Sequence, residues 1–137
     1  MIVVDSNVIA YCWINGPFTA LAQSVRVKDP EWHAPILWRS EMRNILTGYL
    51  RDGSLDAAQI SRVMDTAENA LSGSEHVVTS TPVLEAAGRS RLSAYDCEFV
   101  VLASMLAVPL VTAEKAILKA FPERAMTMGA FVAGRQS

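Results

Sequence analysis

Short apolar runs alternate with longer segments of helical periodicity along the whole chain. Strands are expected at five short runs bounded by polar, glycine or proline residues, namely 2–4, 32–34, 76–79, 109–111 and 125–128. Helices are expected between them, at 17–28, 37–50, 57–71, 94–107 and 112–121, with shorter helical segments after the first strand, at 81–88 and in the tail. Such alternation predicts a parallel sheet covered on both faces. We therefore expect residues 1–137 to form one three-layer α/β/α domain with four or five parallel strands.

Several helix boundaries carry local signals. Asp56 followed by Gln59 forms a capping-box pattern at the start of one helix. Ser93 is expected to cap the most apolar helix of the chain, whose even distribution of apolar residues predicts burial. Gly88 is expected to break the helix that begins near residue 81, and Thr112 is expected to open the short helix after the fourth strand.

Composition narrows the class of protein. With 137 residues, 51% of them apolar and 19% charged, the chain can bury a core, which excludes disorder as its default state. The net charge of -2 argues against a polybasic coat but allows a local nucleic-acid patch. Cys12 and Cys97 lie in apolar runs and are expected to be buried, reduced thiols. The sequence shows neither a bilayer-spanning run of about 18 apolar residues nor a signal-peptide pattern, so we expect a cytoplasmic protein.

Four acidic residues stand in apolar surroundings. Asp5 directly follows the first strand, Glu41 lies on the apolar face of its helix, Asp96 lies in the most apolar helix, and Glu114 comes three residues after the fourth strand. Buried carboxylates are costly unless they are paired or bind a cation, and carboxylate oxygens suit Mg²⁺ or Mn²⁺. Such a cluster favours metal-assisted hydrolysis of a phosphodiester, because the ion activates water and neutralises charge on the leaving oxygen.

Each of these acids also has an ordinary structural explanation. Taken singly, none of them establishes a site; together they favour one. The alternatives are a helix cap for Asp5, a capping box with Ser93 for Asp96, a helix N-terminus beside Thr112 for Glu114, and for Glu41 either a side chain that reaches solvent at the edge of the apolar stripe or an ion pair with Arg39 or Arg43.

The segments around the four acids resemble the motifs of PIN-domain ribonucleases. The resemblance lies in VVDSNVI at 3–9, RSEMRNIL at 39–46, LSAYD at 92–96 with its apolar helix, and PLVTAE at 109–114. It covers almost the whole chain in order, and the length is similar to that of the VapC-type toxins of toxin–antitoxin pairs. The third and fourth motifs are the most specific.

This resemblance implies a metal-dependent endoribonuclease, usually a homodimer that a cognate antitoxin inhibits. Asp5, Glu41 and Asp96 would hold Mg²⁺ or Mn²⁺, with Glu114 binding directly or through water. Glu114 is a departure, because the family usually has Asp there, and the extra methylene shifts the carboxylate. The alternative is therefore a catalytically weakened PIN-like module that binds RNA or protein.

Other polar residues are candidates for positioning and substrate binding. Ser6, Asn7 and Thr112 carry groups that can orient carboxylates or contact a phosphate, with turn and cap chemistry as the alternative. Arg39 and Arg43 flank Glu41 and are the best candidate phosphate contacts, although such arginines often only form a solvated surface. The three tryptophans are expected in the core or at a dimer face rather than stacked on bases.

One other enzyme class deserves comparison, namely proteins that form an aspartyl phosphate. A strand-end Asp5 with Lys115 after a later strand fits that class. Asn7 stands where a second acid is expected, and no Asp follows the run at 76–79. The sequence therefore favours the nuclease.

Overall fold

The five strands found within residues 1–134, the part of the chain that this computed structural model describes, form one sheet. Every neighbouring pair is parallel, and the strand order is β3-β2-β1-β4-β5. The strands are β1 (Ile2–Val4), β2 (Trp32–Pro35), β3 (Glu75–His76), β4 (Leu110–Val111) and β5 (Ala125–Met126). The expected parallel α/β architecture is confirmed.

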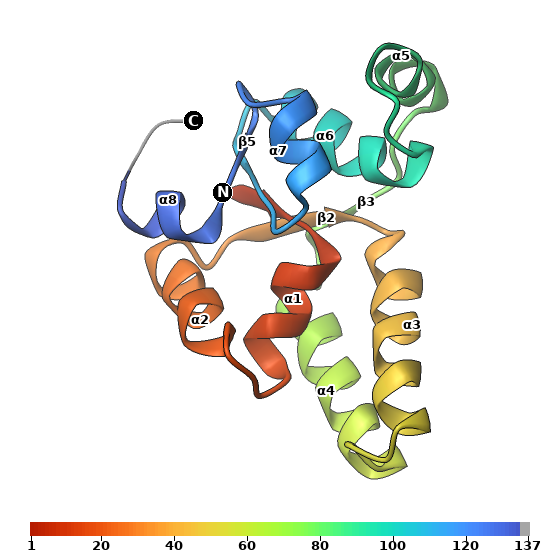
Figure 1. Ribbon diagram of the computed structural model, residues 1–137, viewed down its shortest axis with the longest axis vertical. Helices are drawn as coiled ribbons and strands as arrows, with labels where there is room; N and C mark the ends of the chain where they lie inside the picture. Colours follow the sequence, from red (N-terminus) through yellow and green to blue (C-terminus); the bar gives the residue numbers. More distant parts are fainter. Residues whose placement is uncertain (135–137) are drawn as a thin grey trace.

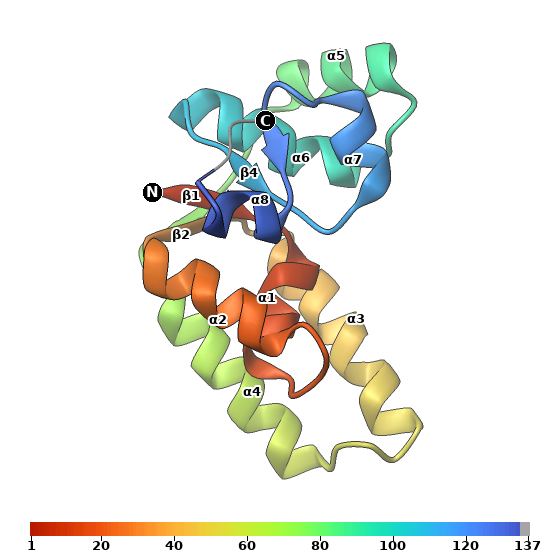
Figure 2. The same ribbon diagram turned by 60° about the vertical axis from the view of Figure 1, so that its left-hand side comes forward.

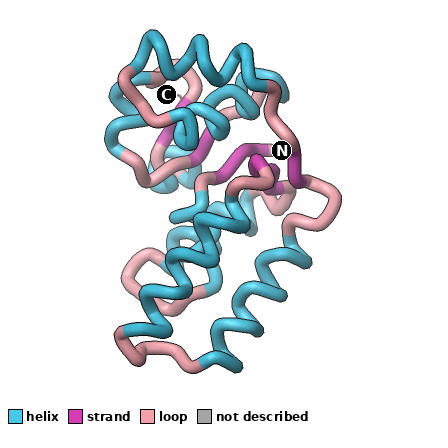
Figure 3. The backbone as a smooth tube through the Cα atoms, turned by 90° about the vertical axis from the view of Figure 1, so that its right-hand side faces the viewer, coloured by secondary structure: helices cyan, strands magenta, loops and turns pink. Residues whose placement is uncertain are grey.

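Helices cover both faces of this sheet (Figures 1 and 2). One layer holds α1 (Ser6–Trp13), α2 (Thr19–Lys28), α3 (Trp38–Arg51) and α4 (Ala57–Ala70), with α8 (Met128–Val132) packed against α2. The other layer holds α5 (Ser80–Ser90), α6 (Ala94–Leu106) and α7 (Lys115–Ala120). In Figure 3 the strands form a thin layer between the two groups of helices. Within residues 1–134, none of the helices is long and apolar enough to cross a membrane.

The core explains why α6 is apolar almost all round. The helix packs against β1, β2 and β4, and its side chains from Phe99 to Ala103 are all buried. Trp32 and Trp38 are also buried, which confirms core packing for these two tryptophans. Cys12 and Cys97 are buried and free, as expected.

Most of the local boundary signals are confirmed. Asp56 and Gln59 form the expected reciprocal capping box at the start of α4. Ser93 caps α6, its hydroxyl accepting a hydrogen bond from the backbone of Asp96.

Several boundaries differ from expectation. The fifth strand ends at Met126 rather than at 128, because Thr127 caps α8, and the helix expected from residue 17 begins at Thr19. Gly88 does not break α5, which continues to Ser90; a helical glycine costs only about 1 kcal/mol, too little to end a packed helix. The third strand covers only Glu75–His76, because the chain leaves the sheet at the exposed Val77. Thr112 does not open α7, whose N-cap position is Glu114. The last three residues of the expected tail, 135–137, lie outside the described part of the chain.

The topology determines where a site can form. The chain runs outward from β1 through β2 to β3 and then returns to β4 on the other side of β1. Ligands of open parallel sheets bind at such a switch point, beyond the carboxyl ends of the strands. Asp5 follows β1 and residues 112–114 follow β4, so both segments lie at this point.

Candidate active site

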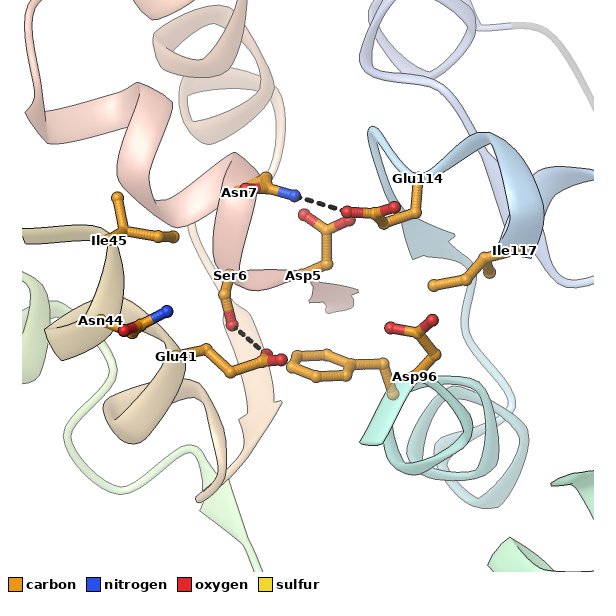
Figure 4. Close-up of a pocket in the computed structure, with 10 residues that line it drawn as sticks. Asp5, Ser6, Asn7, Glu41, Asn44, Ile45, Asp96, Glu114 and Ile117 are labelled. Carbon is orange, nitrogen blue, oxygen red and sulfur yellow. Dashed lines mark hydrogen bonds between the residues drawn. The ribbon is translucent and has the colours of Figure 1, made fainter. Parts of the chain in front are cut away.

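Four acids from four separate segments line one pocket of about 240 Å³ at the switch point. Asp5 follows β1, Glu41 projects from α3, Asp96 from the first turn of α6, and Glu114 precedes α7. Figure 4 shows their carboxylates around a common space. We call this hollow the acid-lined pocket.

Asp5 is the most deeply buried of the four, with 4% of its surface exposed. One carboxylate oxygen accepts from the backbone N–H of Val8 at 2.9 Å and thereby caps α1. The other accepts from the hydroxyl of Thr112 and from the backbone N–H of Ala113. Burial, opposed by these hydrogen bonds and assisted by the charge of Glu114, raises the pKa of Asp5 to about 6. Asp5 therefore caps a helix and faces the pocket at the same time.

Glu41 is bound by a serine and not by an arginine. The hydroxyl of Ser6 donates to its carboxylate at 2.7 Å. Burial raises the pKa of Glu41, and the negative charges of Asp96, Glu98 and Glu114 raise it further. Within residues 1–134 the carboxylate of Glu41 has no salt-bridge partner. The ion pair with Arg39 or Arg43, one alternative explanation of Glu41, is therefore not found.

Asp96 and Glu114 occupy helix starts without capping them by their side chains. Asp96 donates its backbone N–H to Ser93 at 3.1 Å, and burial raises the pKa of its carboxyl group. Glu114 makes no side-chain capping bond on α7; its carboxylate accepts instead from the amide of Asn7 at 2.8 Å. Its backbone N–H donates to the hydroxyl of Thr112 at 3.0 Å. Both carboxylates are therefore turned to the pocket rather than to their own helices.

The three polar residues named with the acids each contact a different acid. Ser6 donates to Glu41, Asn7 donates to Glu114, and Thr112 donates to Asp5. Ser6 and Asn7 also line the acid-lined pocket. Each donor fixes the direction in which one carboxylate points.

The two candidate phosphate contacts are not brought to this pocket. The guanidinium of Arg39 donates to both oxygens of Glu75, at 2.6 and 2.7 Å, and to Glu68 at 3.1 Å. Arg43 is exposed and lines a separate hollow between α3 and α4. In the described part of the chain, no lysine or arginine lines the acid-lined pocket, so its negative charge is not neutralised from within.

Four further lining residues were missed by the sequence analysis. Each lies three or four positions after one of the acids, which places it one helical turn along the same face. This spacing was available in the sequence as a signal. The residues are Asn44, Ile45, Phe99 and Ile117.

A divalent cation fits the donor set of the pocket, although not as a closed protein cage. Among residues 1–134, no three His, Cys, Asp or Glu side chains lie close enough together to enclose an ion. Mg²⁺ is usually held by one or two carboxylates and keeps several waters, so it does not need such a cage. The pocket meets this requirement. Its carboxylates have raised pKa values and no basic side chain among them, and the hollow is large enough to hold an ion with its waters.

Comparison of the sequence with protein-family models and with curated proteins finds no match. Comparison with solved structures finds the crystal structure of PAE2754 from Pyrobaculum aerophilum. The two structures superpose with a TM-score of 0.74 over 97% of this chain and 94% of that chain, at 20% sequence identity. PAE2754 has the PIN-domain fold, and likeness at this identity concerns the fold alone. The chain described here has a PIN-like fold.

Proposed function

We propose that this protein is an endoribonuclease that hydrolyses RNA phosphodiesters with Mg²⁺ or Mn²⁺. One observation carries the proposal: four carboxylates from four segments line one pocket at the switch point of a PIN-like sheet, and no basic side chain of the described chain neutralises them there. The resemblance of the surrounding motifs to PIN-domain ribonucleases supports RNA as the substrate.

Asp5, Glu41 and Asp96 would hold the metal, one or two of them directly and the rest through the waters that Mg²⁺ keeps, with Glu114 also within reach of the ion or its waters. The bound ion would supply an activated water and would neutralise charge on the phosphate. The chain's own contribution is to aim these carboxylates before substrate arrives, while the bonds from Ser6 and Thr112 oppose the rise in pKa that burial causes in Glu41 and Asp5. Its means are the hydrogen bonds to the acids from Ser6, Asn7 and Thr112, of which the Ser6 and Asn7 bonds measure 2.7 and 2.8 Å.

The proposal extends to a biological role through the resemblance alone. A chain of this length with these motifs fits the toxin of a type II toxin–antitoxin system, acting in the cytoplasm. Its partners would be a cognate antitoxin and a second copy of the same chain.

The competing function is a PIN-like module that binds RNA or protein without cleaving. Glu114 motivates it, because glutamate extends one methylene further than aspartate and is held by Asn7 at 2.8 Å. A carboxylate held there takes part in metal binding only if the ion or its waters reach it.

The deciding experiment compares wild type with Asp96→Asn on a panel of structured RNAs, each with Mn²⁺, Mg²⁺ or EDTA. Asp65→Asn makes the same chemical change at an exposed position of α4 and serves as the matched control. We expect cleavage by wild type and control only with metal, and a loss of more than about a hundredfold in Asp96→Asn, beyond what removal of a supporting contact costs.

Two outcomes count against this proposal. Cleavage at the wild-type rate by Asp96→Asn would remove the acid-lined pocket as the catalytic site. Absence of cleavage by wild type and by Glu114→Asp, together with no stabilisation by millimolar Mn²⁺, would favour the binding module.

A further inference from the structure

A second hollow, aromatic rather than acidic, lies directly beside the acid-lined pocket. It measures about 270 Å³, and its aromatic lining comes from Tyr11 of α1, Phe18 at the start of α2 and Tyr49 of α3. We call it the aromatic hollow. Asn7 and Ile45 line both hollows, so the two spaces are separated by single side chains.

The aromatic side chains of this hollow are accessible. Phe18 is 49% exposed and Tyr49 is 36% exposed, and both line the same hollow, so a ligand can reach their rings. Tyr11 packs on Phe18 with ring centroids 5.0 Å apart and an angle of 48° between the rings. The pair is therefore arranged before any ligand arrives.

Tyr11 and Asn15 add polar groups to the lining of the aromatic hollow. Burial raises the pKa of the Tyr11 hydroxyl, and the charges of Asp5, Glu114 and Tyr49 raise it further. The hydroxyl therefore stays protonated at neutral pH and can donate a hydrogen bond. Asn15, on the same rim, adds an amide that can both donate and accept.

Neither hollow supplies positive charge. Among the described residues, the lining of the two hollows contains no lysine or arginine. Within the two hollows, an RNA strand therefore gains no affinity from ion pairs with basic side chains, and a metal at the acids would attract only the phosphate. Stacking of bases on aromatic rings supplies affinity without ion pairs and tolerates every base, because each base has a π-face.

We propose that the aromatic hollow is a base-binding subsite, in which Tyr11, Phe18 and Tyr49 take an unpaired nucleobase next to the phosphate held at the acids. The inference rests on the proposed function and requires the bound base to be unpaired. A paired base is stacked inside its own helix and presents no free face to a protein ring.

Continuity with the acid-lined pocket is the reason for choosing a nucleobase over a side chain of a partner protein. An RNA strand whose phosphate lies among the acids must place an adjoining nucleotide beside Asn7 and Ile45, which are the shared walls. A protein ligand would lie there only if it also blocked the acids, and the binding test below distinguishes it from a nucleobase.

The test measures RNA binding separately from cleavage. In an Asp96→Asn background, in which cleavage and metal binding are expected to be lost, a short random-sequence single-stranded RNA with one fluorescent 2-aminopurine is titrated in EDTA, so that base binding is measured on its own. Phe18→Leu and Tyr49→Leu keep apolar volume and remove the ring at exposed positions. Phe131→Leu removes a ring that lies against Lys28 and lines neither hollow, and is the matched control.

We expect the Asp96→Asn parent and the control to quench the aminopurine, and each of the other two variants to bind about tenfold more weakly with reduced quenching. An RNA with an abasic site in place of the aminopurine should lose affinity for the parent but not for the Tyr49→Leu variant. Because no cation is involved, this difference should change little with salt.

The outcomes separate the two proposals. Equal Kd values for the parent and the Phe18→Leu and Tyr49→Leu variants overturn the base subsite and leave a partner protein as the occupant to consider. If cleavage by the Asp96-containing protein also depends on metal, the nuclease proposal survives that result. Ring-dependent quenching in a protein that cleaves no RNA supports the subsite and overturns the nuclease.

Discussion

Carboxylates meet opposite surroundings in two regions of this molecule. Beside β3, Glu75 accepts two hydrogen bonds from Arg39 and one from the indole of Trp38, and Arg39 chiefly holds the pKa of Glu75 below its usual range. In the acid-lined pocket, burial raises the pKa of three of the four acids. One region is a closed ion-pair cluster of Arg39, Glu68 and Glu75, and the other is a group of acids that lacks a cation.

Helix α3 contributes to both regions, which shows how local the difference is. Arg39 and Glu41 are two residues apart, and residues at this spacing do not face each other on a helix. Arg39 therefore turns to Glu75, and Glu41 turns to Ser6 and the pocket. The sequence distance between a basic residue and an acid therefore does not predict whether the two form an ion pair.

The largest expected effect is the response of the acid-lined pocket to metal. Mn²⁺ at 100 times its Kd should raise the free energy of unfolding of wild type by about 2.7 kcal/mol. The same addition should change Asp96→Asn little. Without metal, Asp96→Asn should be at least as stable as wild type, because a half-buried, partly desolvated negative charge is removed. Urea denaturation with and without Mn²⁺ measures both quantities.

Asp96 is a sharper position for this test than Asp5. Asp5 accepts three hydrogen bonds, one of which caps α1, so its replacement disturbs structure and site together. Lack of stabilisation of wild type by Mn²⁺ would break the contrast between the two regions.

The next effect concerns the ion-pair cluster. Arg39→Met leaves Glu75 and Glu68 without their cation and should lower the Tm at pH 7, while metal stabilisation persists. Because Arg39 lowers the pKa of Glu75, its contribution is present above the usual glutamate pKa and is lost as the pH falls below it. The gap in Tm between wild type and variant should therefore narrow below pH 4.5, the usual value.

Arg43→Met is the control, because Arg43 is exposed on the same helix and a surface change there should stay within about 0.5 kcal/mol. Equal Tm values for Arg39→Met and wild type at pH 7 would show that the cluster is not a stabilising one.

The elements that could be predicted from sequence are those fixed by neighbouring residues. The capping box of Asp56 and Gln59 and the Ser93 cap act within one turn, and both were predictable. Thr112 shows where local reasoning ends: its hydroxyl is used by Asp5, 107 residues away, so it does not open α7. Long-range partners of this kind are decided by packing.

The candidate site divides in the same way. The acids could be proposed from their apolar surroundings and their place after strands, but the destination of Arg39 could not, because Glu75 is 36 residues away. The aromatic hollow was equally hidden, since Tyr11, Phe18 and Tyr49 come from separate segments that only the fold brings together.

The smallest expected effect comes from a third arrangement, a chain of polar contacts at the edge of the sheet. His33 contacts His76 through its Nδ1 at 2.8 Å and Glu31 through its Nε2 at 2.9 Å. Burial, and then the neighbouring His33, lowers the pKa of His76 below 6.5. The folded state therefore binds fewer protons than the unfolded state, and stability falls as the pH drops through 6.5.

Asp5 has the opposite effect: its pKa is raised to about 6, so its contribution to stability increases as the pH falls. Comparing wild type with a His76 variant separates the two contributions. Wild type should lose roughly one or two degrees more in Tm than His76→Gln between pH 7.5 and 5.5, since His76 is partly exposed and screened. Thermal denaturation at the two pH values gives the difference directly, and Asp5 cancels because both proteins contain it. The same pH dependence in both proteins would mean that His76 is as easily protonated folded as unfolded, and that the contact with His33 accommodates the charge.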